Sequence, residues 1–294
     1  MDVLGQIAVN VLIGWAPLVL SALGFSLIYG CCRFLHFAHG VLYTVGAYVV
    51  LVCIRDAHLG PGPAVVVATL IGSALGALCE IGLYRPLVDR GSSPLVMLLV
   101  SIGAYVATQN ALSLGFGDDS KVAYSVKTIS EVGNLGISMT GIQARSIAVS
   151  VVVVVTTWVY LRRSRFGRWI TAVADDASLA FSLGVPVRQV GIGVFAMGSA
   201  LASCAGGLSA WDTKISPTMG MQMLIASVVV VIIGGVGSFG GTIIAAFLVA
   251  TVQQSSAWFF GARWQDAGVF IALIVFLALR PEGVRGLRQR GWAA

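Results

Sequence analysis

Long apolar runs separated by short polar breaks dominate this sequence. Several runs reach about 18 apolar residues, the length typical of a helix that crosses a bilayer. We predict transmembrane helices at 7–30, 38–54, 63–83, 94–114, 145–161, 190–210, 222–236, 241–257 and 266–280. Residues 222–257 could form one broken helix or two, because a glycine-rich stretch interrupts them, so the predicted count is eight or nine. The expected fold is all-α, a polytopic integral membrane protein with 1–294 as a single transmembrane domain.

The composition supports a lipid environment. Hydrophobic residues make up 57% of the 294 residues and charged residues only 10%, against about 25% charged residues in soluble domains. The formal net charge of +6 does not indicate nucleic-acid binding, because the arginines lie in short loops between apolar runs. The five cysteines are scattered in apolar segments without zinc-ligand spacing, so we interpret them as small apolar residues and expect no metal site.

The Lys and Arg residues predict the orientation in the membrane. Twelve of the 18 fall in one set of loops, which the positive-inside rule assigns to the cytoplasm. This set is Arg33, Arg85, Arg90, Arg162, Arg163, Arg165, Arg168, Arg188, Arg280, Arg285, Arg288 and Arg290. With nine spans, the N-terminus would lie outside and the C-terminus in the cytoplasm. The two long loops would then be an extracytoplasmic loop at 115–144 and a cytoplasmic loop at 162–189.

The cytoplasmic loop at 162–189 has the pattern helix, turn, helix. Apolar and small residues recur there at spacings of three and four, which predicts one helical face. That face consists of Ala172, Asp176, Leu179, Ala180 and Leu183. Gly184 is expected to cap the helix, and Pro186 prevents its continuation. The helix could lie on lipid, but its two acids oppose an anionic leaflet, so docking into a groove on another protein is favoured.

Several motifs in chain order resemble the permeases of the branched-chain amino acid ABC importer family. The cytoplasmic loop carries Gly167-Arg168, then Ala172-Val173-Ala174-Asp175-Asp176, then Leu183-Gly184-Val185, in the arrangement of a coupling loop. The other motifs are Tyr29-Gly30, His36-Phe37-Ala38-His39-Gly40, Glu80 with Tyr84-Arg85-Pro86, Gln109-Asn110, Gly234-Gly235-Val236-Gly237-Ser238 and Arg280-Pro281-Glu282-Gly283. The sequence departs from the family at His36, Val41 and Phe239-Gly240, which bears on the substrate rather than on the class of subunit.

The resemblance implies a permease subunit that moves branched-chain or related amino acids into the cytoplasm by alternating access. It implies a multi-pass location in the bacterial inner membrane and, as partners, a second homologous permease, two cytoplasmic ABC ATPases and a periplasmic substrate-binding protein. It also assigns ATPase coupling to Arg168, Ala172, Asp175, Asp176, Leu179, Ala180, Leu183 and Gly184.

No catalytic motif is present in the sequence. There is no nucleophile elbow and no phosphate-binding loop, since the glycine run at 234–241 contains no lysine. The chain is therefore not expected to be an enzyme or to bind a cofactor, and ATP and magnesium would be bound by the partner ATPases.

Other residues have a functional and a structural interpretation. The glycines Gly234, Gly235, Gly237, Gly240 and Gly241 must break a helix, as a hinge or pathway element or for close packing. Phe37, His39, Gln109 and Asn110 are candidates for the pathway or for structural roles.

For His36 and His39 we favour hydrogen bonds to loop carbonyls. For Glu80, an ion pair with Arg85 is at least as plausible as substrate contact. Gln253 and Gln254 could bond neighbouring helices or line a polar path.

Three rival functions stay open. The first is an ABC importer permease for urea, short amides or aromatic acids. The second is an ion-coupled secondary transporter, which would need coupling-ion ligands and usually repeated halves; the sequence has one glycine break and no clear duplication. The third is a membrane enzyme, which would need a cluster of reactive groups on the cytoplasmic side.

Overall fold

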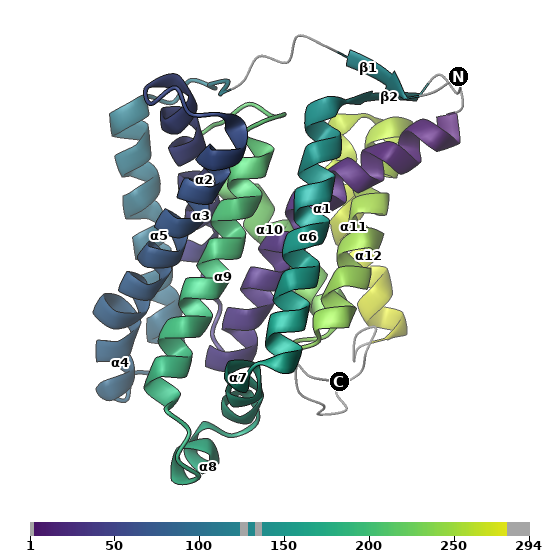
Figure 1. Ribbon diagram of the computed structural model, residues 1–294. Coiled ribbons are helices and arrows are strands. Elements are labelled where there is room, and N and C mark those ends of the chain that lie inside the picture. The colour runs from purple at the N-terminus through teal and green to yellow at the C-terminus, as the bar shows by residue number, and fades with distance from the viewer. Residues whose placement is uncertain (1–2, 124–128, 133–136, 281–294) are drawn as a thin grey trace.

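The computed structural model describes residues 3–123, 129–132 and 137–280, and it confirms the all-α, polytopic prediction (Figure 1). Within these residues, eight helical segments are long and apolar enough to span a membrane. They contain α1 (Val3–Cys32), α2 (Ala38–Arg55), α3 (Pro61–Cys79), α5 (Pro94–Phe116), α6 (Gly141–Arg163), α9 (Val187–Ser209), α11 (Phe239–Phe260) and α12 (Gln265–Leu279). The third segment continues from α3 through a π-helical turn, Glu80–Tyr84, into α4 (Arg85–Asp89), and a 3-10 turn, Ala262–Trp264, precedes α12.

The shorter helix α10 (Met219–Gly234) completes the bundle. Its 16 residues give a length of about 24 Å, less than the roughly 30 Å hydrocarbon core of a bilayer. The helix ends at Gly234 and α11 begins at Phe239, so the glycine-rich stretch separates two helices rather than bending one.

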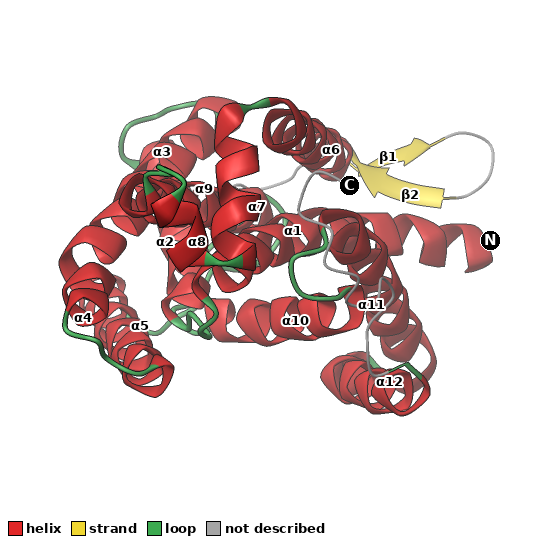
Figure 2. Cartoon of the chain, turned by 90° about the horizontal axis from the view of Figure 1, so that it is seen from below, coloured by secondary structure: helices red, strands yellow, loops and turns green. Residues whose placement is uncertain are grey.

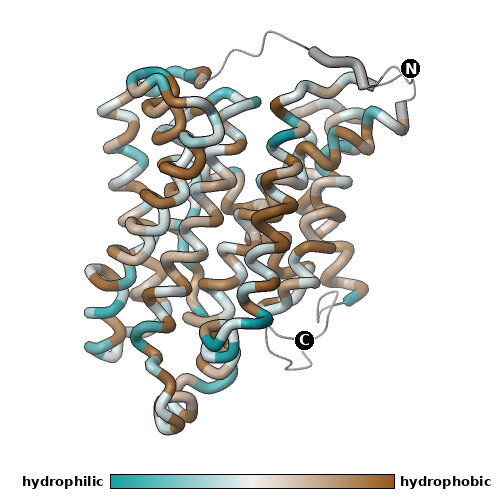
Figure 3. The backbone as a smooth tube through the Cα atoms, viewed as in Figure 1, coloured by the Kyte–Doolittle hydropathy of each residue, from teal (hydrophilic) through white to brown (hydrophobic). Residues whose placement is uncertain are grey.

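The two predicted sets of loops lie at opposite ends of the bundle. One end holds α4, α7 (Arg165–Asp175), α8 (Ala177–Ser182) and the end of α12, and we call it the loop end (Figure 1). The other end holds the start of α1 and a hairpin of β1 (Ile129–Val132) and β2 (Ile137–Thr140), in which Ile129 pairs with Thr140. Hydrophilic residues gather at both ends (Figure 3). That the C-terminus is cytoplasmic stays a prediction, and residues 281–294 lie outside the described part.

Helix α9 is at the centre of the packing because its surface is made of small residues. It packs against α1, α2 and α3. A Cβ on Gly206 would collide with the carbonyl of Tyr43 in α2, and a Cβ on Gly24 of α1 would collide with the carbonyl of Gly198. The hydroxyl of Ser203 donates to the carbonyl of Leu42 at 2.9 Å. Small residues let helix backbones approach where lipid offers no hydrophobic drive for association.

The outer helices of the bundle are the most exposed. Seen from below, α4 and α5 lie at one edge of the bundle and α12 at the opposite edge, with α1 and α9 between them (Figure 2). Only 11% of the most apolar stretch of α5 and 6% of that of α12 are buried, against 72% for α1. Their exposed Leu and Ile side chains therefore suit a hydrocarbon environment rather than water.

The glycine run forms a tight turn at the loop end. Gly235 and Gly237 have positive φ angles of 88° and 75°, which glycine adopts without strain. Gly234 and Gly241 pack back to back, since a Cβ on Gly234 would lie 2.7 Å from the carbonyl carbon of Gly241. Ser238 caps α11 by accepting a hydrogen bond from the Gly241 amide at 3.1 Å. The run is thus closely packed, and its role as a hinge stays a prediction.

Replacing Gly206 with Val should destabilise the fold by on the order of 3 kcal/mol or more, because the new side chain meets backbone that cannot move aside. Thermal unfolding of the detergent-purified protein measures the effect. Gly103→Val is the matched control, since nothing lies within 4 Å of a Cβ at that helical position. Equal melting temperatures for the two variants would contradict this account of α9.

Candidate functional site

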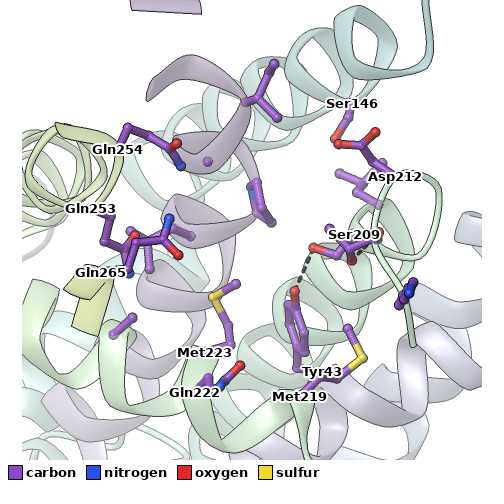
Figure 4. Close-up of a pocket in the computed structure, with 18 of the residues that line it drawn as sticks. Tyr43, Ser146, Ser209, Asp212, Met219, Gln222, Met223, Gln253, Gln254 and Gln265 are labelled. Atoms are coloured by element: carbon purple, nitrogen blue, oxygen red, sulfur yellow. Dashed lines mark hydrogen bonds between the residues drawn. The ribbon is translucent and has the colours of Figure 1, made fainter. Parts of the chain in front are cut away.

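A polar cavity of about 420 Å³ lies between α1, α2, α6, α9, α10, α11 and α12, on the side of the bundle away from the loop end. Five glutamines line it, and we call it the glutamine cavity (Figure 4). These are Gln143, Gln222, Gln253, Gln254 and Gln265.

One wall of the glutamine cavity carries amide groups. Gln253 and Gln254 come from α11 and Gln265 from the first turn of α12 (Figure 4). Among the residues drawn, these three side chains make no hydrogen bond. The amide of Gln254 packs beside Gly14 of α1, where a Cβ would lie 3.0 Å from its Nε2 atom. This wall therefore presents amide donors and acceptors to the space that it encloses.

The facing wall carries hydroxyl groups and a carboxylate. The Tyr43 hydroxyl donates to the hydroxyl oxygen of Ser209 at 2.6 Å. Asp212 accepts hydrogen bonds from the Nε2 atom of Gln143 at 3.1 and 3.0 Å, one to each carboxylate oxygen. Gln143 is itself held at the start of α6, where it forms a capping box with Thr140. The carboxylate of Asp212 is therefore fixed in position although it is solvent-exposed.

Apolar groups complete the lining. Met219 and Met223 of α10 lie beside Gln222, and Leu18 and Ala226 also contribute. Pro17 lies inside α1 at this level. A proline has no N–H, so the carbonyl four residues earlier loses its helical partner, and that residue, Ile13, also lines the cavity.

Four residues predicted as pathway candidates lie outside the glutamine cavity. The amide of Phe37 donates to the Ser101 hydroxyl at 3.1 Å. The Nε2 atom of His39 lies 3.0 Å from the carbonyl oxygen of Ser21. Asn110 bonds the carbonyl of Val106 in its own helix at 2.7 Å, and Gln109 is half-buried on the same helix, α5. Their roles in a pathway stay predictions.

His36 and Glu80 also lack the partners that the sequence suggested for them. His36 is fully buried, and its Nδ1 atom lies 2.8 Å from the Tyr84 hydroxyl rather than at a loop carbonyl. The sequence left an ion pair with Arg85 as one of two alternatives for Glu80; among the described residues, Arg85 forms its ion pair with Asp89 instead, at 3.0 Å. A spacing of four along a helix places Asp89 on the same face as Arg85.

A second candidate region is formed by α7 and α8 at the loop end. Asp176 separates the two helices with an extended backbone, φ −152°, and its carboxylate accepts hydrogen bonds from the amides of Ser178 at 2.9 Å and Leu179 at 3.0 Å. These bonds lower the pKa of the Asp176 carboxyl, and the bond from the Leu179 amide has the largest effect.

At the other end of α8, Gly184 has a φ of 82°, and the Val185 amide donates to the Ala180 carbonyl at 3.0 Å, as in a Schellman cap. The predicted cap at Gly184 is confirmed.

The predicted single helical face across this region is wrong. Asp176 prefers to cap the start of a helix, since its side chain competes for backbone amides, so the period does not continue from Ala172 to Leu183. Ala180 is 2% exposed and points into the protein. Leu179, Phe181 and Leu183 are 57%, 72% and 75% exposed, and we call these three side chains the apolar tip.

Arg33 connects α7 to the rest of the bundle. It follows α1 and donates from its guanidinium to the carbonyl of Ala174 at 2.7 Å. A cation at the last turn of a helix also suits the helix dipole. Phe166 of α7 packs over Gly193 of α9, where a Cβ would collide with its ring. Movement of α7 would therefore be transmitted to both α1 and α9.

Comparison with protein families decides the class of the chain. Residues 7–279 match the family described as branched-chain amino acid transport system, permease component. The chain belongs to this permease family. It is a transport permease and a multi-pass membrane protein.

Individual relatives agree with this family. The permease is 28% identical over 280 residues to the high-affinity branched-chain amino acid transport system permease protein LivH of Salmonella typhimurium, covering 91% of this chain and 90% of LivH. It is 28% identical over 294 residues to BraD of Pseudomonas aeruginosa, a permease of the same description, covering 96% and 95%. A probable LivH of Methanocaldococcus jannaschii is 24% identical, covering 92% and 89%. No solved structure matches the permease.

Most residues of the glutamine cavity were not predicted as functional. The sequence singled out Gln253 and Gln254 as polar groups in an apolar run. Tyr43, Asp212 and Gln265 carry no local signal, because only the packing of distant helices brings them together.

Replacing Asp176 with Ala should loosen α8, because the helix loses the acceptor for its first amides. Hydrogen exchange should accelerate at Ala177–Ser182 in the permease, and Asp175→Ala is the matched control because Asp175 is an exposed neighbour outside the cap.

Since the pKa of Asp176 is lowered, the cap is fully formed above the usual Asp value of about 3.9 and is lost as the pH falls through the lowered pKa. Equal exchange in both variants at neutral pH would contradict the capping role.

Proposed function

We propose that this permease is the membrane-spanning subunit of an ATP-driven importer that moves branched-chain or related amino acids into the cytoplasm by alternating access. Its partners would be a second, homologous permease, two cytoplasmic ABC ATPases and an extracytoplasmic substrate-binding protein. The chain would bind no nucleotide, and ATP with magnesium would be held by the ATPases. The relatives named above support the substrate class, since each is described as a branched-chain amino acid permease.

The apolar tip is the observation that carries this proposal. Leu179 and Phe181, on the short helix α8, and Leu183, directly after it, are exposed beyond the end of the bundle. Exposed apolar side chains in water mark a contact site for another protein. An apolar helix suits a groove on such a partner, here the ATPase.

Coupling would then follow the contacts of α7. Closure of the ATPases on ATP would move α8 and, through the Schellman cap and Asp176, the adjoining α7 and α9. Arg33 would pass the movement to α1 through Ala174, and Phe166 would pass it to α9 through Gly193. Both α1 and α9 reach the glutamine cavity at their far halves. A displacement at the loop end would thus change the shape of the cavity.

An ion-coupled secondary transporter is the alternative of another class. It would move solute without partner ATPases, whereas an importer subunit would require them. Uptake by the permease alone in proteoliposomes under an ion gradient, without ATP, would favour the alternative.

Replacing Phe181 with Asp should abolish ATPase association and lower ATP-driven uptake at least tenfold, because a charge would enter an apolar contact. Co-purification of the ATPases and uptake in proteoliposomes measure these effects. Val88→Asp is the matched control, since Val88 is also exposed at the loop end but lies on α4. Unchanged co-purification of the ATPases with the Phe181→Asp variant would overturn the docking role of the tip.

A further inference from the structure

We propose that the glutamine cavity is a binding site in the permease for a zwitterionic aliphatic amino acid, with Asp212 receiving the ammonium group and the amide wall receiving the carboxylate. This inference rests on the proposed function as an amino acid importer and adds the residues that would recognise the solute within the membrane subunit itself.

Asp212 is prepared to accept an ammonium group. Each of its carboxylate oxygens already accepts from Gln143, which fixes the carboxylate in one orientation. An ionised carboxylate has about four acceptor positions, so Asp212 can accept further hydrogen bonds. Charge-assisted bonds of this kind are roughly twice as strong as neutral ones. The carbonyl of Ile13, freed by Pro17, is a neutral acceptor on the same cavity.

The amide wall suits the carboxylate of the solute. Gln253, Gln254 and Gln265 face the cavity without bonds to the other residues drawn there (Figure 4). Each side-chain amide offers two N–H donors. If these glutamines served only to join helices, they would bond across to a neighbouring helix, and in this structure they instead present their amides to the cavity. Three neutral amide groups would hold a carboxylate without binding it too strongly for release.

The charge of the lining favours a zwitterion over an anion. Asp212 and Asp266 line the cavity together with Lys214, so its acids outnumber its single cation. A potential of this sign disfavours a solute that carries only a carboxylate. A zwitterion pairs its ammonium with Asp212 and places its carboxylate at the amide wall.

The apolar part of the lining suits an aliphatic side chain. Met219, Met223, Leu18 and Ala226 provide it, and methionine adapts to side chains of different shape. The cavity volume of about 420 Å³ lies within the roughly 300–1,000 Å³ of typical small-molecule sites. Solutes that differ in aliphatic shape but share the zwitterionic group would therefore bind alike.

The test uses the purified transporter, permeases with their ATPases, in lipid nanodiscs without the substrate-binding protein. Radiolabelled L-leucine binding is measured directly, with three unlabelled competitors. These are L-leucine, 4-methylpentanoate, which lacks the ammonium group, and 3-methylbutylamine, which lacks the carboxylate. L-leucine should displace the label at concentrations at least tenfold below those of either analogue.

Two variants locate the site. Asp212→Asn should weaken L-leucine binding at least tenfold, and Asp119→Asn, an exposed acid outside the cavity, should bind as the unmodified protein does. Gln253→Leu should weaken binding as well, and it keeps the test decisive if the Asp212 variant does not fold. ATPase co-purification and elution volume report folding.

The outcomes separate this inference from the proposed function. Absence of L-leucine binding, equal competition by 4-methylpentanoate or by 3-methylbutylamine, or unchanged binding in a folded Asp212 or Gln253 variant would each overturn the cavity assignment. The importer function would still stand if the complete transporter, with its binding protein, accumulates L-leucine on addition of ATP. Failure of that uptake would instead overturn the proposed function.

Discussion

The close approach of α9 to α1, α2 and α3 is the contact on which the rest of the structure depends. Gly206 lies against the carbonyl of Tyr43, and a Cβ on Gly46 of α2 would collide with the backbone of Ser203. Larger side chains at these positions would separate the helices. The same contact sets the Tyr43 hydroxyl beside Ser209 at the last turn of α9. One wall of the glutamine cavity is therefore a direct result of how closely α2 and α9 pack.

Helix α9 also links the two ends of the protein. Its first half lies under Phe166 of α7, and its last turn reaches the cavity. A closely packed helix transmits displacement because its neighbours offer little free space. Few charged groups are needed on such a path, in keeping with a chain whose charged residues make up only 10%. The permease thus has the apolar tip at one end, the glutamine cavity at the other, and a closely packed helix between them.

The sequence predicted much of this arrangement because lipid imposes simple rules. Apolar runs located the spans, and arginine placement grouped the loops at two ends. Local chemistry also predicted the cap at Gly184 correctly, since a positive φ there needs glycine. The helical period failed at Asp176, where a capping side chain outcompeted the periodic pattern. The cavity was largely hidden, because Tyr43, Asp212 and Gln265 meet only through the packing of helices that are far apart in the chain.

The central claim is that ATPases at the loop end change the cavity at the opposite end. Chemical labelling of a Gln253→Cys variant tests this claim most directly. A membrane-impermeant maleimide is added from outside intact proteoliposomes in which the ATPases face inward. The account predicts that the labelling rate at position 253 changes severalfold between the nucleotide-free and the ATP-trapped transporter, while an Asp119→Cys control labels equally in both. The same rate at position 253 in the two states would contradict the claim.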